Sequence, residues 1–142
     1  MSIHSAKQIT KGIKFDGTAA LPEGTLDESC AKSVWRVQNK TAAYTVLETD
    51  SGTTFFTLGA TGSITFTLPS VPKKGLHYRF VNSTAEDVLV AATANTLVAY
   101  ADATATSVTI TNIGVMLEVI ADGNSWYCVT YGVVSGAAAT VT

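Results

Sequence analysis

The most regular part of the chain is a run in which apolar and hydroxylated residues alternate. Ile64, Phe66 and Leu68 are separated by threonines, and Pro69 closes the run. Because successive side chains of a strand point to opposite faces, this alternation predicts a strand with one apolar and one hydroxyl-bearing face. The same texture recurs in short segments from about residue 33 to about residue 132, separated by Gly, Pro, Asp and Ser.

Short segments at this spacing are typical of an all-β sandwich or barrel. No stretch of the sequence shows sustained helical periodicity with a capping residue. We therefore expect one face of each strand to pack against a second sheet and the other to meet solvent or a neighbouring subunit. Asp122-Gly123-Asn124 is a turn of the hairpin type between two of these segments.

The first thirty or so residues have a different pattern. Glycines and Pro22 separate isolated apolar residues, and no period of 2 or 3.6 is sustained. A segment of this kind cannot form a core and either stays mobile or becomes ordered on a partner. We divide the chain into an extended N-terminal arm, residues 1–32, and a β-sandwich domain, residues 33–142, which ends in a short tail of small residues.

Composition places the chain among folded proteins. Apolar residues make up 46% of its 142 residues and charged residues 14%, the opposite of the balance in disordered chains. The length suits one domain with its own core. Without a run of about 18 apolar residues, no membrane span is expected. The N-terminus lacks the apolar core of a signal peptide, so we expect synthesis in the cytosol.

Charge is distributed unevenly along the chain. Residues 1–15 contain three lysines and no acid, whereas residues 41–142 contain three basic and seven acidic residues. An acidic body argues against nucleic acid as the main partner, because phosphate binding needs a basic surface. The three lysines belong either to a solvated end or to an arm that lies on an acidic partner.

The predicted outward faces carry Thr, Ser and Ala more often than Lys or Glu. A monomer usually keeps its surface rich in charge, and edge strands are commonly protected by Lys or Pro. Short side chains with little entropy to lose suit a surface that packs against another copy. We therefore expect a homo-oligomer, although β-propensity alone would also favour threonine.

The sequence offers little catalytic chemistry. His77 is a lone strand histidine without a nucleophile motif around it. Glu86 and Asp87 are adjacent, so a strand would point them to opposite faces. The turns are too poor in acids to favour a calcium site. Cys30 and Cys128 have no metal-binding spacing; we expect two reduced thiols, with a disulfide as the alternative. We expect no enzyme activity, no metal and no cofactor.

The aromatic residues divide into two groups. We expect Trp35, Phe66, Phe80 and Trp126 to fill the core. Tyr127 and Tyr131 share a strand face with Val129, opposite Trp126. If the protein presents a stacking platform for a glycan, this exposed aromatic face is where we expect it.

Three segments in succession carry a family resemblance: "DSGTTFFTLGATGSITFTLP", "KGLHYRFVN" and "ADGNSWYCVTYG". Their shared elements are a strand ending in Leu68-Pro69, a Gly-led strand up to Phe80, and a closing Asp-Gly-x-x-Trp hairpin. Over residues 50–132 the chain resembles small β-modules of tailed-bacteriophage structural proteins, found in capsid decoration (cement) proteins, head fibres and tail fibres. The resemblance implies a virion component, often trimeric, with a jelly-roll-like antiparallel β-sandwich.

The short domain with a basic arm looks most like a capsid decoration protein. Such a protein is made in the host cytoplasm and binds the capsid exterior as a homo-oligomer, here expected to be a trimer, cementing neighbouring capsomers. Its partner would be the major capsid protein. The residues expected to carry capsid contact in the arm are Lys7, Ile9, Lys11, Ile13, Lys14 and Phe15. The alternatives are a carbohydrate- or receptor-binding module of a phage fibre and a secreted β-sandwich adhesin domain.

Overall fold

The strands expected from the alternating pattern are present in the structure, a computed structural model. It describes residues 35–93, 96–99 and 102–132, and gives only strand assignments for residues 14–15, 19–20 and 139–141. The chain divides into two units, Met1–Val34 and Trp35–Thr142. In the first, β1 (Lys14–Phe15) pairs antiparallel with β2 (Ala19–Ala20). Lys7, Ile9, Lys11 and Ile13 lie outside the described residues.

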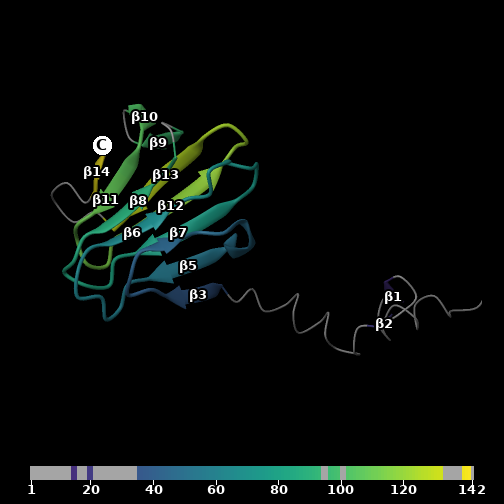
Figure 1. The fold of residues 1–142 in the computed structure, drawn as a ribbon, viewed down its shortest axis with the longest axis horizontal. Helices are drawn as coiled ribbons and strands as arrows, with labels where there is room; N and C mark the ends of the chain where they lie inside the picture. Colours follow the sequence, from purple (N-terminus) through teal and green to yellow (C-terminus); the bar gives the residue numbers. More distant parts are fainter. Residues whose placement is uncertain are drawn as a thin grey trace, which may run out of the picture. The chain divides into compact units, whose positions relative to one another are not determined.

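The second unit contains two sheets (Figure 1), with strand orders β10-β9-β13-β12-β7-β5-β3 and β14-β11-β8-β6-β4. The seven-stranded sheet consists of β3 (Arg36–Asn39), β5 (Thr53–Phe56), β7 (His77–Val81), β9 (Leu97–Ala99), β10 (Asp102–Ala105), β12 (Met116–Ala121) and β13 (Trp126–Tyr131). The five-stranded sheet consists of β4 (Tyr44–Thr45), β6 (Ile64–Thr67), β8 (Val88–Ala91), β11 (Ser107–Ile110) and β14 (Ala139–Val141). A single turn of 3-10 helix, η1 (Glu48–Asp50), follows β4. The expected all-β sandwich is confirmed.

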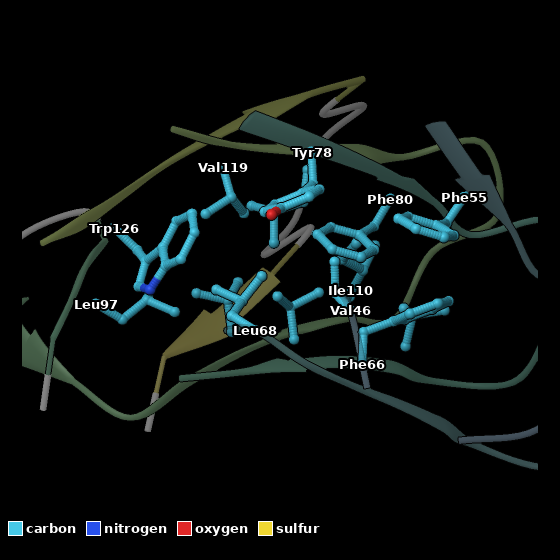
Figure 2. Close-up of a cluster of buried hydrophobic side chains, with 14 of the residues drawn as sticks. Val46, Phe55, Phe66, Leu68, Tyr78, Phe80, Leu97, Ile110, Val119 and Trp126 are labelled. Atoms are coloured by element: carbon cyan, nitrogen blue, oxygen red, sulfur yellow. The ribbon is translucent and has the colours of Figure 1, made fainter. Parts of the chain in front are cut away.

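The core lies between the two sheets and is rich in aromatic rings. Phe55 and Phe80 from the seven-stranded sheet meet Phe66 from the five-stranded sheet, with ring centroids 4.9–5.5 Å apart. Tyr78 packs beside Trp126 at 5.8 Å. Figure 2 shows these rings filling the space between the sheets, and all five are fully buried. Three of the four aromatics expected in the core are there; the exception is Trp35.

Strand pairing differs from the expected antiparallel arrangement. From β3 to β8, consecutive strands alternate between the two sheets. A chain that crosses to the other sheet after every strand re-enters the first sheet in its original direction. Accordingly β3, β5 and β7 run parallel, and so do β4, β6 and β8. The prediction of a purely antiparallel sandwich is therefore wrong for this half of the domain.

Antiparallel pairing predominates in the second half, where β12 lies between β7 and β13 and β11 pairs with β8. Even there, β9 runs parallel to β13. The predicted hairpin joins β12 to β13, with Ala121 opposite Trp126. Gly123 adopts φ 112° at its tip, a conformation that favours glycine. The Asp122 side chain accepts hydrogen bonds of 2.8 Å from the backbone N–H groups of Asn124 and Ser125. These bonds lower the pKa of Asp122.

No helix in the described part of the chain is long and apolar enough to cross a membrane.

Candidate interaction face

The side of the seven-stranded sheet that points away from the core forms a broad surface. Across β5, β7, β12 and β13, register partners place Thr54, Arg79, Glu118 and Val129 in one row. Phe56, Val81, Met116 and Tyr131 form a second row, and His77, Ile120 and Tyr127 a third. Val37 extends the first row onto β3. We call this surface, with Trp35, the outer face.

Large apolar side chains gather on the outer face. Ten of them are exposed in the described part of the domain, and six of the ten lie here, with exposed fractions of 43–61%. The six are Trp35, Val37, Ile120, Tyr127, Val129 and Tyr131. The other four lie in turns and loops. Exposed apolar side chains gathered on one face are uncommon on a monomer and are typical of an interaction site.

A polar network occupies the centre of the outer face. The Arg79 guanidinium donates to Glu118 Oε1 from Nε at 2.9 Å and contacts the same oxygen from Nη2 at 2.8 Å. The Tyr131 hydroxyl donates to Glu118 Oε2 at 3.1 Å. The guanidinium also lies over the Trp35 ring, 3.9 Å from its centroid. Both carboxylate oxygens are therefore engaged, and the two charges compensate each other.

The network is largely shielded from water although it lies on the surface. The Arg79 and Glu118 side chains are only 20% and 14% exposed. The hydrogen bond to Glu118 and its negative charge raise the pKa of Tyr131. At the other end of β13, the negative charge of Asp122 raises the pKa of Tyr127. The Tyr131 hydroxyl is thus already bound to a carboxylate of this chain.

The opposite side of the sandwich has a different composition. The outward residues of the five-stranded sheet are mainly threonines and small residues, in rows set by the registers of β4, β6, β8 and β11. We call them the threonine face; the described members are Thr45, Thr65, Thr67, Leu89, Ala91, Ser107 and Thr109. None of these members is charged, and Leu89 is the only large apolar one.

The structure separates the residues that sequence analysis singled out. Tyr127, Val129 and Tyr131 share an exposed strand face, and Trp126 points into the core. Trp35, expected in the core, is 53% exposed and covers Arg79 instead.

The structure describes one of the two cysteines. Cys128 is a free, half-buried thiol, and burial raises its pKa to about 12. Cys30 lies outside the described residues.

The Arg79–Glu118 pair was not predicted from the sequence, although the pattern of polar residues in both strands pointed toward it. The alternation in β7 already placed His77 and Arg79 on the polar side of the strand. Glu118 is a single charge within an apolar strand, and such a charge usually has an opposite partner. Nothing in the sequence showed that β7 and β12 are neighbours.

In the described residues, no group of three or more His, Cys, Asp or Glu side chains could hold a metal ion. His77 Nδ1 lies 3.2 Å from the Gly75 carbonyl oxygen.

Comparison with known proteins gives no family for this chain. No protein-family model matches the sequence, and no curated protein matches it.

Proposed function

We propose that this chain is a non-enzymatic structural protein of a phage virion. In this proposal it binds the outside of an assembled capsid as an oligomer, expected to be a trimer, and cements neighbouring capsomers. The observation that carries the proposal is the outer face, where exposed aromatic and aliphatic side chains surround a charge-compensated centre. Trp, Tyr, Met and Arg are the residues enriched in protein interfaces.

The resemblance to phage β-modules supplies the biological context. Two of its three motifs fall on elements that build the outer face: Gly75 leads into β7, and the Asp122–Trp126 stretch joins β12 to β13. The third, Leu68-Pro69, follows β6 of the other sheet. The resemblance and the exposed apolar surface therefore overlap in part.

The proposal assigns different contacts to the two parts of the chain. The β-sandwich carries contacts between copies, and the basic arm carries contact with the major capsid protein. Several arms on one oligomer provide multivalency, so that weak individual contacts hold the complex firmly. A protein that binds only the assembled lattice stabilises that lattice by mass action.

Binding to purified capsids of the encoding phage tests this function. The full chain is expected to saturate the capsids at a fixed copy number per particle. A variant lacking residues 1–28 should lose capsid binding while keeping its fold and oligomeric state. A full chain that ignores these capsids, or that turns over a substrate, would refute the proposal.

A second candidate is a glycan- or receptor-binding module of a phage fibre. The observation in its favour is that the rings of Trp35, Tyr127 and Tyr131 are exposed on one face. Sugar sites combine ring stacking with free polar groups that fix orientation, whereas the Tyr131 hydroxyl here is bound to Glu118. Saturable glycan binding that a Tyr127→Ala substitution abolishes, without capsid binding, would favour this candidate.

A further inference from the structure

We propose that the outer face is where copies of this chain pack together, so that its occupant is the same face of a second copy. The inference deepens the proposed assembly role and rests on it. In a trimer, these faces would meet around the three-fold axis.

The outer face has the apolar content that association needs. Ile120, Val129 and Val37 lie on three different strands of one sheet and are 43%, 45% and 61% exposed. Tyr127 and Tyr131 extend the same surface along β13. Burying apolar area provides most of the free energy of protein association, and fully covered Tyr, Trp and Arg side chains commonly contribute the largest single terms.

The charge of the face favours a second copy over a charged partner. Arg79 and Glu118 compensate each other at a distance of 2.8 Å. Besides Tyr127 and Tyr131, His77 is the remaining titratable side chain in the described rows, and Asp122 lies at the rim beside Tyr127. Two identical faces bring like charges together, so self-packing requires a surface with little uncompensated charge. A nucleic acid or an anionic membrane would need a basic surface, which this face lacks.

The central network also lowers the cost of covering the face. Burying an unpaired charge costs several kcal/mol, but both Glu118 oxygens already have donors within the same chain. The pair is already largely withdrawn from water, with 20% and 14% of the side chains exposed. A second copy can therefore cover the network without providing a new polar partner. A sugar, whose hydroxyls need free donors and acceptors, has less to gain here.

The threonine face provides a comparison with the outer face within the same domain. It belongs to the same sandwich and its described members carry no charge, but most of them are short and hydroxylated. Leu89, its one large apolar member, is half-buried between neighbouring strands. It offers far less exposed apolar area, so we expect it to remain uncovered when copies associate.

Matched lysine substitutions in the full chain test the choice of face. Ile120→Lys and Val129→Lys place a charge on the outer face, and Thr67→Lys and Thr109→Lys place the same charge on the threonine face. All four positions point away from the core in a strand. Mass in solution is measured by sedimentation velocity over a range of concentrations, and folding by far-UV circular dichroism and thermal melting.

The wild type and both threonine-face variants are expected to form the same oligomer. Each outer-face variant should stay folded but dissociate, with a dissociation constant raised about tenfold or more, as for hot-spot residues. Because Trp126 is fully buried and Trp35 is 53% exposed, acrylamide quenching of fluorescence should report mainly on Trp35. Quenching should be weak in the oligomer and stronger in the dissociated variants.

Three results would overturn the inference. The first is a wild-type chain that is monomeric at about 100 μM, a concentration far above the dissociation constant of a specific interface. The others are outer-face variants that keep the wild-type mass and threonine-face variants that dissociate. These results are separable from failure of the proposed function. An oligomer that uses the outer face but ignores capsids would refute the decoration role and keep the inference. A monomer that binds capsids would do the reverse.

Discussion

The two ion pairs in the described part of the domain allow a direct measurement of how far water is excluded from the outer face. Arg79–Glu118 and Lys73–Glu48 have nearly equal N···O distances, 2.8 and 2.7 Å. Their surroundings differ, because the first pair is 20% and 14% exposed and the second 59% and 45%. We expect a double-mutant cycle to give a much larger coupling free energy for the Arg79–Glu118 pair.

The expected magnitudes follow from the local dielectric. Two unit charges about 4 Å apart attract by about 1 kcal/mol in water and about 4 kcal/mol at an effective dielectric constant of 20. The shielded pair lies between these limits, so we expect a coupling of about 2–3 kcal/mol. Exposed pairs contribute about 0.2–1 kcal/mol after screening and side-chain entropy are included, which is the range expected for Lys73–Glu48.

The cycle uses Arg79→Met and Glu118→Gln, singly and together, beside Lys73→Met and Glu48→Gln as the matched control. Unfolding by urea gives the free energy of each variant. All variants carry Ile120→Lys, because association would otherwise make stability depend on protein concentration. Repeating the cycles in 1 M salt, where the Debye length falls to about 3 Å, should remove the Lys73–Glu48 coupling and leave most of the other.

Equal couplings for the two pairs, or couplings that both vanish in salt, would refute the reasoning. Either result would mean that water reaches Glu118 as freely as it reaches Glu48. The outer face would then not hold a shielded centre, and a second copy could not cover it at low cost.

Three further predictions concern the sandwich itself. Phe80→Ala should destabilise the domain by about 3–5 kcal/mol in urea unfolding because its ring is fully buried, whereas Val81→Ala on the outward side should cost far less; equal losses would contradict the assigned core. Gly132→Ala should destabilise by about 1–3 kcal/mol, since φ is +95° and the new Cβ would lie 3.2 Å from a backbone oxygen; Gly62→Ala, with open space around it, should be neutral. Burial raises the pKa of Tyr78 to about 12, so the folded state keeps a proton that the unfolded chain releases near pH 10, and stability should fall as pH rises from about 10 to 12. Tyr78→Phe should flatten that fall in urea midpoints, and an unchanged slope would contradict the assignment.

The side-chain pattern was enough to predict which residues of a strand face the core. In β6, Ile64 and Phe66 are buried and the threonines between them face outward, as alternation requires. The hairpin between β12 and β13 was also predictable, because its Asp-Gly turn is a local signal. Both features depend only on residues close together in the sequence.

Strand neighbours could not be predicted from this pattern. A period of two shows which side of a strand is apolar, but it is the same for parallel and antiparallel neighbours. Whether β5 pairs beside β3 or forms a hairpin depends on where the intervening segment crosses to the other sheet. That segment contains β4 and η1, which are too short for their apolar residues to indicate that the chain crosses to the other sheet. The Arg79–Glu118 pair depends on the same unknown, since it joins β7 to β12.

Trp35 shows a different limit of sequence reasoning. Its size and apolarity favour burial, but it lies at the start of β3, the last strand of its sheet. The core beneath that sheet is already filled by Phe55, Phe66 and Phe80. The indole instead lies against the Arg79 guanidinium on the outside, an arrangement that a cation–π contact stabilises by about 0.5–1 kcal/mol.

The contrast between the two surfaces of the sandwich distinguishes β-propensity from association as the cause of their composition. If outward residues were chosen only to suit strands, both surfaces would carry a similar mixture of β-branched and aromatic residues. The described outward residues of the five-stranded sheet are instead mainly threonines and small residues, whereas the seven-stranded sheet carries exposed Tyr127, Tyr131 and Trp35 around a shielded ion pair. β-Propensity alone does not account for this difference, and leaving such side chains in water carries a risk of aggregation. A surface that is covered in the working state of the protein removes the risk, and the compensated charge of this face allows a second copy to cover it.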